Sequence, residues 1–271
     1  SNYSPSQYGF LKQDYEQDIE RLYKEINDFN PNIIITMGGL GLWALTNIDK
    51  IGSYRGALTY SNVGRLNRPY KIMPTYSPFA VLKNYSFRPT VVSDLKKAGQ
   101  ESTTKDIENT EREIYIEPTY EEVVQFFKEC REENSKDNPL SFDIETASGE
   151  ITCIGFAPSP KRSMVVPFRD ITKKSQAFYD YTTEITIWKE IADLLQDEKI
   201  TKVAQNQTYD VSWLSYKYGI DVAGTVHDTM HAQHSLQPEM EKGLGFLGSI
   251  YTNEGAWKNL TSFSKSTKAE E

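Results

Sequence analysis

The most regular alternation of apolar and polar residues lies in the second half of the chain. Within Leu140–Thr146 every second side chain is apolar, and Asp143 and Glu145 fall on the opposite face. A period of two predicts a β-strand with one buried face. Apolar runs at 151–157 and 163–168 follow short turns rich in Ser, Gly and Pro. The pattern therefore predicts a three-stranded antiparallel meander.

Helical spacing surrounds this meander. Apolar positions three and four apart predict helices at 120–130 and 185–195. A short predicted strand at 202–205 leads into another helical run, which ends at Gly219, a typical helix stop. Strands and helices in this order predict a mixed α/β layer fold for residues 114–271.

Residues 1–98 carry a separate α/β pattern. Apolar spacing predicts a helix at 11–29, then strands at 32–37 and 70–74. The glycines of Gly38–Gly41 between the first strand and a helix have the form of a phosphate-binding loop. They do not fit the Gly-x-Gly-x-x-Gly spacing, and a tight strand-to-helix crossover is the other interpretation.

Length and charge divide the chain further. The polar stretch 99–113 lacks periodic apolar residues and predicts a linker between two domains, for which 271 residues suffice. The net charge is −8, yet residues 31–100 hold nine Lys or Arg against two Asp or Glu, a local charge of +7. Such a basic block is a possible footprint for a polyanion. The basic candidates for nucleic-acid contact are Arg55, Arg65, Arg68, Lys71 and Lys83.

The remaining composition bears on location. No apolar run approaches the about 20 residues that span a bilayer. The first residues lack the basic and apolar segments of a secretion signal. Cys130 and Cys153 have neither metal-site spacing nor an obvious disulfide partner. These features predict a chain of the cytoplasm, the host cytoplasm if the protein is viral, without a membrane partner.

Three acidic residues are candidates for a metal-binding site. Asp143 and Glu145 lie on one strand face about 6.5–7 Å apart, where a divalent ion would relieve their repulsion; a solvated strand face is the alternative. Asp210 begins a helix just past a strand end, where open α/β sheets place their active sites. Its alternative role is a favourable interaction with the helix dipole. Together the three hard oxygen donors predict a site for Mg²⁺ or Mn²⁺.

A second metal-binding pattern involves the three histidines of the chain, His227, His231 and His234. Spaced by four and three residues, they would share a face of a continuous helix and could hold zinc. The alternative is that Asp228 caps this helix and that the histidines are partly exposed polar residues.

Ordered motifs over residues 139–258 resemble the 3′–5′ proofreading exonuclease domain of family A DNA polymerases, within the wider DEDD nuclease group. The matching motifs are Phe142-Asp143-Ile144-Glu145-Thr146, then Asn206-x-x-Tyr209-Asp210, then Asp228-Thr229-Met230 with Lys242-x-Leu244. The resemblance implies an RNase H-like mixed sheet and two-metal hydrolysis of the 3′-terminal phosphodiester of single-stranded DNA. It also implies a polymerase domain in the same parent chain.

The resemblance assigns roles to individual residues. Asp143 would bridge both ions, Glu145 would bind the ion that activates water, and Asp210 would hold the second ion through water. Thr146 and Asn206 are candidates for contact with the terminal nucleotide. Asp228 is a secondary candidate for the site. A DEDD nuclease acting on RNA would use the same acids, and a non-catalytic DNA-binding or scaffolding piece is a further alternative.

The third motif of that family, Tyr-x-x-x-Asp, has no match downstream. Tyr251 is followed four residues later by Gly255, and Phe263 by Thr267. We therefore expect an exonuclease-like domain, 114–271, that is C-terminally incomplete and possibly inactive as a fragment.

Pro31–Ala98 resembles the C-terminal half of a uracil-DNA glycosylase-like domain. The resemblance rests on the strand-Gly-Gly-helix, on Arg55-Gly56, and on a strand that ends in Pro74-Thr75-x-x-Pro78. That family usually has a histidine where this chain has Ser77, and its water-positioning motif has no counterpart in residues 1–30. The resemblance implies a degenerate, inactive partial module at 1–98. A glycosylase-like segment before an exonuclease-like domain resembles certain bacteriophage polymerases.

Overall fold

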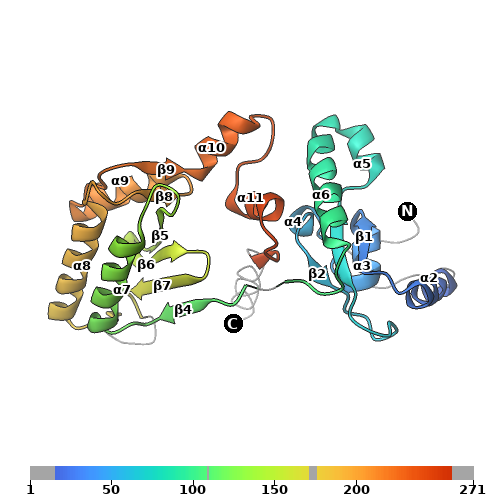
Figure 1. Ribbon diagram of the computed structural model, residues 1–271, viewed down its shortest axis with the longest axis horizontal. Coiled ribbons are helices and arrows are strands. Elements are labelled where there is room, and N and C mark those ends of the chain that lie inside the picture. The colour runs from blue at the N-terminus through green and yellow to red at the C-terminus, as the bar shows by residue number, and fades with distance from the viewer. Residues whose placement is uncertain (1–15, 109, 171–175, 258–271) are drawn as a thin grey trace. The chain divides into compact units, whose positions relative to one another are not determined.

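The computed structural model describes residues 16–108, 110–170 and 176–257. The chain forms two compact units (Figure 1). The first unit comprises the residues up to 109 and those from 237 on, and the second unit comprises residues 110–236. Within the described residues, no helix is long and apolar enough to cross a membrane.

A three-stranded sheet of order β1-β3-β2 forms the centre of the first unit. β1 (Ile33–Met37) runs parallel to β3 (Lys71–Thr75), and β2 (Thr59–Tyr60) is antiparallel to it. The helices of the residues before 109 are α2 (Glu16–Phe29), α3 (Gly39–Thr46), α4 (Ile51–Tyr54), α5 (Pro78–Lys83), the 3-10 helix η2 (Tyr85–Phe87) and α6 (Arg88–Glu101).

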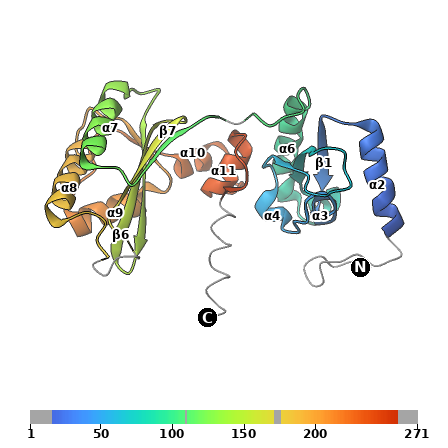
Figure 2. The same ribbon diagram turned by 90° about the horizontal axis from the view of Figure 1, so that it is seen from below.

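Helices cover both faces of this sheet. Ile72 of β3 packs in a cluster with residues of α2 and α3, while the next residue, Met73, packs with Ala98 of α6. Accordingly, α2 and α6 flank β1 on opposite sides (Figure 2). The predicted strands at 32–37 and 70–74 are confirmed, as is the part of the predicted helix within the described residues. Residues 11–15 of that helix lie outside them.

The predicted linker 99–113 is in part wrong. Helix α6 continues through Glu101, and the segment after it contacts the ammonium of Lys71, which is fully buried. This ammonium donates hydrogen bonds to the Glu101 carboxylate, the Thr104 hydroxyl and the Asp106 carbonyl oxygen. Because a buried charge must be paired or hydrogen-bonded, Lys71 holds this polar segment against the first unit.

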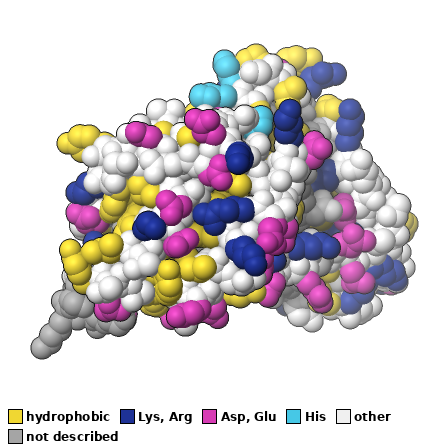
Figure 3. Space-filling view, turned by 60° about the vertical axis from the view of Figure 1, so that its left-hand side comes forward, with side chains coloured by type: hydrophobic (Ala, Val, Ile, Leu, Met, Phe, Trp, Pro, Cys, Tyr) yellow, Lys and Arg dark blue, Asp and Glu magenta, His cyan; other side chains and the backbone are white. Residues whose placement is uncertain are grey.

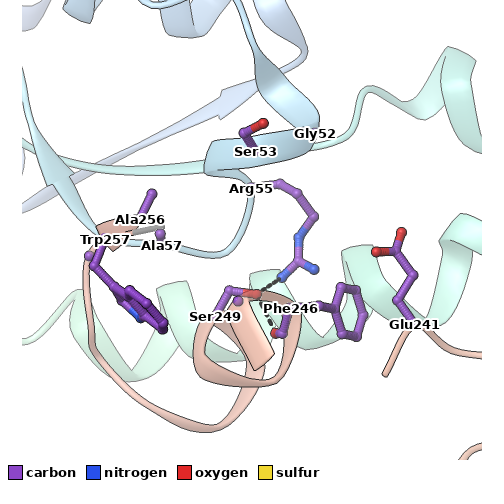
Figure 4. Close-up of a pocket in the computed structure, with 11 residues that line it drawn as sticks. Gly52, Ser53, Arg55, Ala57, Glu241, Phe246, Ser249, Ala256 and Trp257 are labelled. Carbon is purple, nitrogen blue, oxygen red and sulfur yellow. Dashed lines mark hydrogen bonds between the residues drawn. The ribbon is translucent and has the colours of Figure 1, made fainter. Parts of the chain in front are cut away.

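Helix α11 (Leu244–Tyr251) also belongs to the first unit, because two buried cations bind it. Arg55 donates to the Ser249 hydroxyl over 2.7 Å (Figure 4). It also donates to the Asp94 carboxylate over 3.1 Å. Lys97 donates to the carbonyl oxygens of Ser249 and Thr252. We expected residues 114–271 to form one domain, whereas residues 237–257 pack with the first unit.

Steric crowding explains the glycine of the Arg55-Gly56 pair in the first unit. Gly56 has a φ of +73°, and a Cβ there would lie 2.7 Å from Oδ1 of Asp94. A side chain at this position would therefore displace the carboxylate that pairs with Arg55. The elements of 31–98 follow the order expected from the glycosylase-like resemblance, which stays a prediction.

The second unit contains a six-stranded mixed sheet of order β4-β7-β6-β5-β8-β9. Its strands are β4 (Glu113–Ile116), β5 (Leu140–Ala147), β6 (Glu150–Ser159), β7 (Arg162–Pro167), β8 (Lys202–Ala204) and β9 (Val226–Asp228). The meander β5-β6-β7 is antiparallel as predicted, and β8 pairs parallel with β5. The mixed α/β fold predicted for this part is confirmed, although β9 is a strand that the pattern did not predict.

One large apolar core lies beneath this sheet. The helices that contribute side chains to this core are α7 (Tyr120–Glu133), α8 (Tyr181–Leu195) and α9 (Gln207–Tyr218). A further helix of the unit, α10 (Thr229–Leu236), follows β9. Leu140, Phe142 and Ile144 of β5 point into the core, where α7 and α8 lie side by side (Figure 1). The alternation of β5 therefore leaves Asp143 and Glu145 exposed on the other face.

Candidate active site

The two predicted strand carboxylates lie on the exposed face of a central strand. β5 pairs with β6 on one side and β8 on the other. Asp143 lies opposite Gly155 of β6, which presents no side chain, and Glu145 lies opposite Cys153. A bulge follows directly, between Glu145 and Thr146. Bulges commonly re-aim side chains beside active sites, and this one lies at the end of the first predicted motif.

Asp210 brings the third predicted acid to the same strand. Its side chain is 3% exposed, and its Oδ1 accepts a hydrogen bond of 2.9 Å from the backbone N–H of Ile144. Ile144 is the residue between Asp143 and Glu145, so the structure brings the three predicted acids to one segment of β5. Burial raises the pKa of Asp210, and the Glu145 carboxylate raises it further, while the N–H of Ile144 opposes the shift.

These acids suit a hard cation by their chemistry. Within the described residues, no three His, Cys, Asp or Glu side chains form a cage around one ion. Mg²⁺ does not require such a cage, because it usually keeps several waters and takes one or two carboxylates together with substrate phosphates. The exposed pair on β5 matches the one or two carboxylates of such a site, and the binding of a metal by these acids stays a prediction.

A hydrogen bond connects the two motifs above the strand. The hydroxyls of Thr146 and Tyr209 lie 2.6 Å apart, which joins the end of β5 to the first turn of α9. Asn206, the other predicted nucleotide contact, is exposed and left-handed in backbone conformation, with φ of 58°. Tyr209 was not among the predicted site residues, although it stands inside the second motif, next to Asp210.

Asp228 positions the ends of two helices. Its carboxylate accepts hydrogen bonds from the backbone N–H groups of Asn206 and Gln207 at the start of α9, and of Met230 and His231 in α10. Burial raises the pKa of Asp228, but these four N–H groups outweigh it and hold the pKa below its ordinary value. Asp228 is therefore a cap, as one of the two alternatives predicted.

The histidine pattern does not form a metal centre in the described residues. His227, His231 and His234 are exposed, and histidine side chains are visible on the surface in Figure 3. His231 lies 3.7 Å from the Asp228 carboxylate. The predicted zinc site is thus replaced by the capping arrangement.

The five basic candidates divide by burial. Arg55 and Lys71 are buried, each paired with a carboxylate, which corrects their predicted contact with a nucleic acid. Arg68 donates to the side chain of Asn30 and stacks on a tyrosine ring. Arg65 and Lys83 remain exposed. Part of the basic block is therefore internal: three of its nine cations, Arg55, Lys71 and Lys97, are buried.

Ser77, in the Pro74–Pro78 loop that resembles the glycosylase-like family, has a structural role. Ser77 caps α5, and its hydroxyl accepts a hydrogen bond from the N–H of Ala80. A Cβ on Gly38, the first glycine of the turn after β1, would lie 3.3 Å from the Cβ of Ser77. The turn and the loop are therefore closely packed.

The sequence model of the 3′–5′ exonuclease family matches residues 114–268, more than half of the chain. The chain belongs to this 3′–5′ exonuclease family. It is also similar to a DNA polymerase of Bacillus phage SP01, with 26% identity over 239 residues, which are 79% of this chain. The match covers 25% of that polymerase, so the chain spans about a quarter of the length of this relative.

Three solved structures are also similar. The EXD2 exonuclease domain soaked in Mn and GMP shares 18% identity at a TM-score of 0.35, covering 51% of this chain and 68% of that one. Brucella melitensis NrnC shares 17% at 0.34, covering 52% and 60%. Escherichia coli RNase D, an exoribonuclease, shares 13% at 0.38, covering 53% and 34%.

Proposed function

We propose that this chain is the proofreading region of a larger DNA polymerase and hydrolyses single-stranded DNA from its 3′ end with Mg²⁺ or Mn²⁺. Membership of the exonuclease family supports the reaction, and the similarity to a phage DNA polymerase supports the setting. The observation that carries the proposal is the hydrogen bond from Ile144 to Asp210. It brings a buried carboxyl to the strand segment that exposes Asp143 and Glu145.

Each acid has a proposed role. Asp143 and Glu145 would hold the ions, because they are the exposed oxygen donors of β5. Such ions would lower the pKa of the attacking water and stabilise the charge on the leaving 3′ oxygen. Asp210 would complete the donor set, and a nearby cation would favour the carboxylate form that its burial disfavours.

The neighbouring polar groups would orient the substrate. Thr146 and Tyr209 hold each other by their hydroxyls, next to the acids on both motifs. We propose that they and Asn206 contact the terminal nucleotide. Tyr209 is 45% exposed, so its ring can meet a base or sugar while its hydroxyl stays paired with Thr146.

The test measures the stepwise shortening, from the 3′ end, of a 5′-labelled DNA oligonucleotide with Mg²⁺ or Mn²⁺. Asp143→Ala is expected to reduce the rate by at least about a hundredfold, because a metal ligand is removed. Asp193→Asn is the matched control, since this acid lies on α8 in an exposed pair with Lys189. No shortening by the unsubstituted chain, or equal rates for both variants, would contradict the proposal.

The same assay separates DNA from RNA as substrate. An RNA oligonucleotide of the same sequence is degraded more slowly than DNA if the proofreading role is right. Faster degradation of RNA would retain the acids but reject the proposed role in DNA synthesis.

A further inference from the structure

Helix α9 presents three large aromatic side chains on one face. Tyr209, Trp213 and Tyr216 are spaced by four and three residues, which places them in one row along a helix. We call this row the aromatic stripe. Tyr209 is 45% exposed and Tyr216 is 92% exposed. The ring centroids of Tyr209 and Trp213 lie 6.3 Å apart.

The stripe is not the core face of the helix. Leu214 of α9 is fully buried in the apolar core, and Val211 packs against it. Tyr216, in contrast, is among the most exposed apolar side chains of the described residues. Trp213 packs partly against this core, whereas the ring of Tyr216 lies almost wholly outside it and is available for an external contact.

The stripe begins at the candidate active site. Tyr209 precedes Asp210, and its hydroxyl meets that of Thr146 at the end of β5. From Tyr209 to Tyr216 the helix rises by about 10 Å. At about 3.4 Å for each stacked base, this distance matches about three nucleotides of a single strand. A strand whose 3′ end lies at the acids can therefore follow the stripe.

A pocket accompanies the far part of the stripe. It has a volume of about 300 Å³ and is lined by Gly149, Ser212, Trp213, Tyr216 and Lys217. Gly149 lies in the turn between β5 and β6, and no atom lies within 4 Å of the place of a Cβ there. The ammonium of Lys217 lies 3.2 Å from the Glu150 carboxylate at the rim. Flat apolar rings beside one cation match a base and its phosphate.

We propose that Trp213 and Tyr216 form a subsite that stacks the bases upstream of the 3′-terminal nucleotide of a single strand. This inference rests on the proposed function, because the stripe is assigned to DNA by its continuity with the exonuclease site. Stacking on aromatic side chains tolerates every base, as an exonuclease requires of a subsite that meets any sequence. The stripe would thus hold the strand while successive nucleotides are removed.

The test measures binding of the full chain to a labelled oligo-dT by fluorescence anisotropy in EDTA, where hydrolysis is prevented. Tyr216→Ala is expected to weaken binding about tenfold, as for the loss of one stacked base. Because this side chain is almost wholly exposed, the substitution leaves the core intact. Tyr181→Ala is the matched control, since Tyr181 is 82% exposed on α8 in the same unit, and its affinity should stay within about twofold.

An abasic oligonucleotide of equal length isolates stacking from charge. It is expected to bind weakly and equally to the unsubstituted chain and to Tyr216→Ala. Intrinsic fluorescence gives a second measurement, because oligo-dT should quench Trp213, and Trp213→Phe should remove that quenching.

The outcomes separate this inference from the proposed function. Equal oligo-dT affinity of Tyr216→Ala and the unsubstituted chain would overturn the subsite and leave the stripe as a face for a protein. An equal loss of affinity for the abasic strand would also overturn it, since stacking would not be the cause. Failure of hydrolysis with intact, Tyr216-dependent binding would instead reject the nuclease proposal alone.

Discussion

The two units are stabilised by different kinds of interior. The second unit has one large apolar core to which its strands and helices contribute. The first unit has two small apolar clusters, and buried Arg55, Lys71 and Lys97 connect its segments through hydrogen bonds. Lys202 is buried in the second unit, but the hydrogen bonds of its ammonium go to backbone carbonyls, those of Asp197, Ile200 and Ala223, and not to a carboxylate. The stability of the first unit therefore depends on buried cations that join distant segments, and the stability of the second unit depends on apolar contact.

Breaking the buried pair should have the largest effect on stability. Asp94→Ala leaves the Arg55 guanidinium buried without its carboxylate, which costs about 3–5 kcal/mol. Hydrogen exchange on the full chain should show lost protection in the first unit, α11 included, and unchanged protection in the second. Asp18→Ala, in an exposed pair on α2, is the control. Equal loss of protection in both units would contradict the comparison.

Truncating an apolar side chain in the core of the second unit should destabilise that unit and leave the first unit unchanged. Leu194→Ala removes a fully buried side chain from the core of the second unit and should cost about 3 kcal/mol. In the same exchange measurement the second unit should lose protection and the first should keep it. Leu236→Ala, at a position 71% exposed, should change neither unit. Protection lost in the first unit would show that the two interiors are not independent.

Alkaline pH should raise the free energy of unfolding of the first unit through the buried Lys97. Burial lowers the pKa of Lys97 to about 8, against an ordinary value of 10.5. Between these values the unfolded chain binds more protons than the folded one, so stability rises with pH, by on the order of 1–3 kcal/mol. This gain is lost as the pH falls through about 8. Urea unfolding from pH 7 to 10 should show a smaller rise for Lys97→Met, and parallel curves would exclude the effect.

Exposed pairs should matter least. Lys189 and Asp193 lie 3.8 Å apart on the surface of α8, one helical turn from each other. Lys189→Ala should change the free energy of unfolding by less than about 0.5 kcal/mol, because solvent screens such pairs. A loss above about 1 kcal/mol in urea unfolding would mean that surface charge also stabilises the second unit.

The alternating pattern of β5 was enough to predict the central strand and the exposed face of Asp143 and Glu145. The place of Asp210, at a helix start just past a strand end, also predicted that it would come near them, because open α/β sheets place their active sites there. These predictions depend on local periodicity, which the sequence displays directly. The roles proposed for the acids in metal binding stay predictions.

Long-range partners could not be predicted in the same way. Ser249 meets Arg55 across 194 positions of sequence, and no local pattern announces that contact. The basic block therefore resembled a surface, although Arg55 and Lys71 are internal. Strand β9 was missed for another reason: three residues are too few to show a period, and pairing with β8 defines them.

The position of α11 has a consequence for synthesis on the ribosome. Residues 110–236 are inserted in sequence between the two segments of the first unit. Two of the carbonyl oxygens that accept from Lys97, those of Ser249 and Thr252, lie in the second of these segments, so they are made after residues 110–236. Domains generally fold as they emerge. Here the first unit is completed only after residues 110–236 have been made, when Arg55 and Lys97 gain their partners in and next to α11.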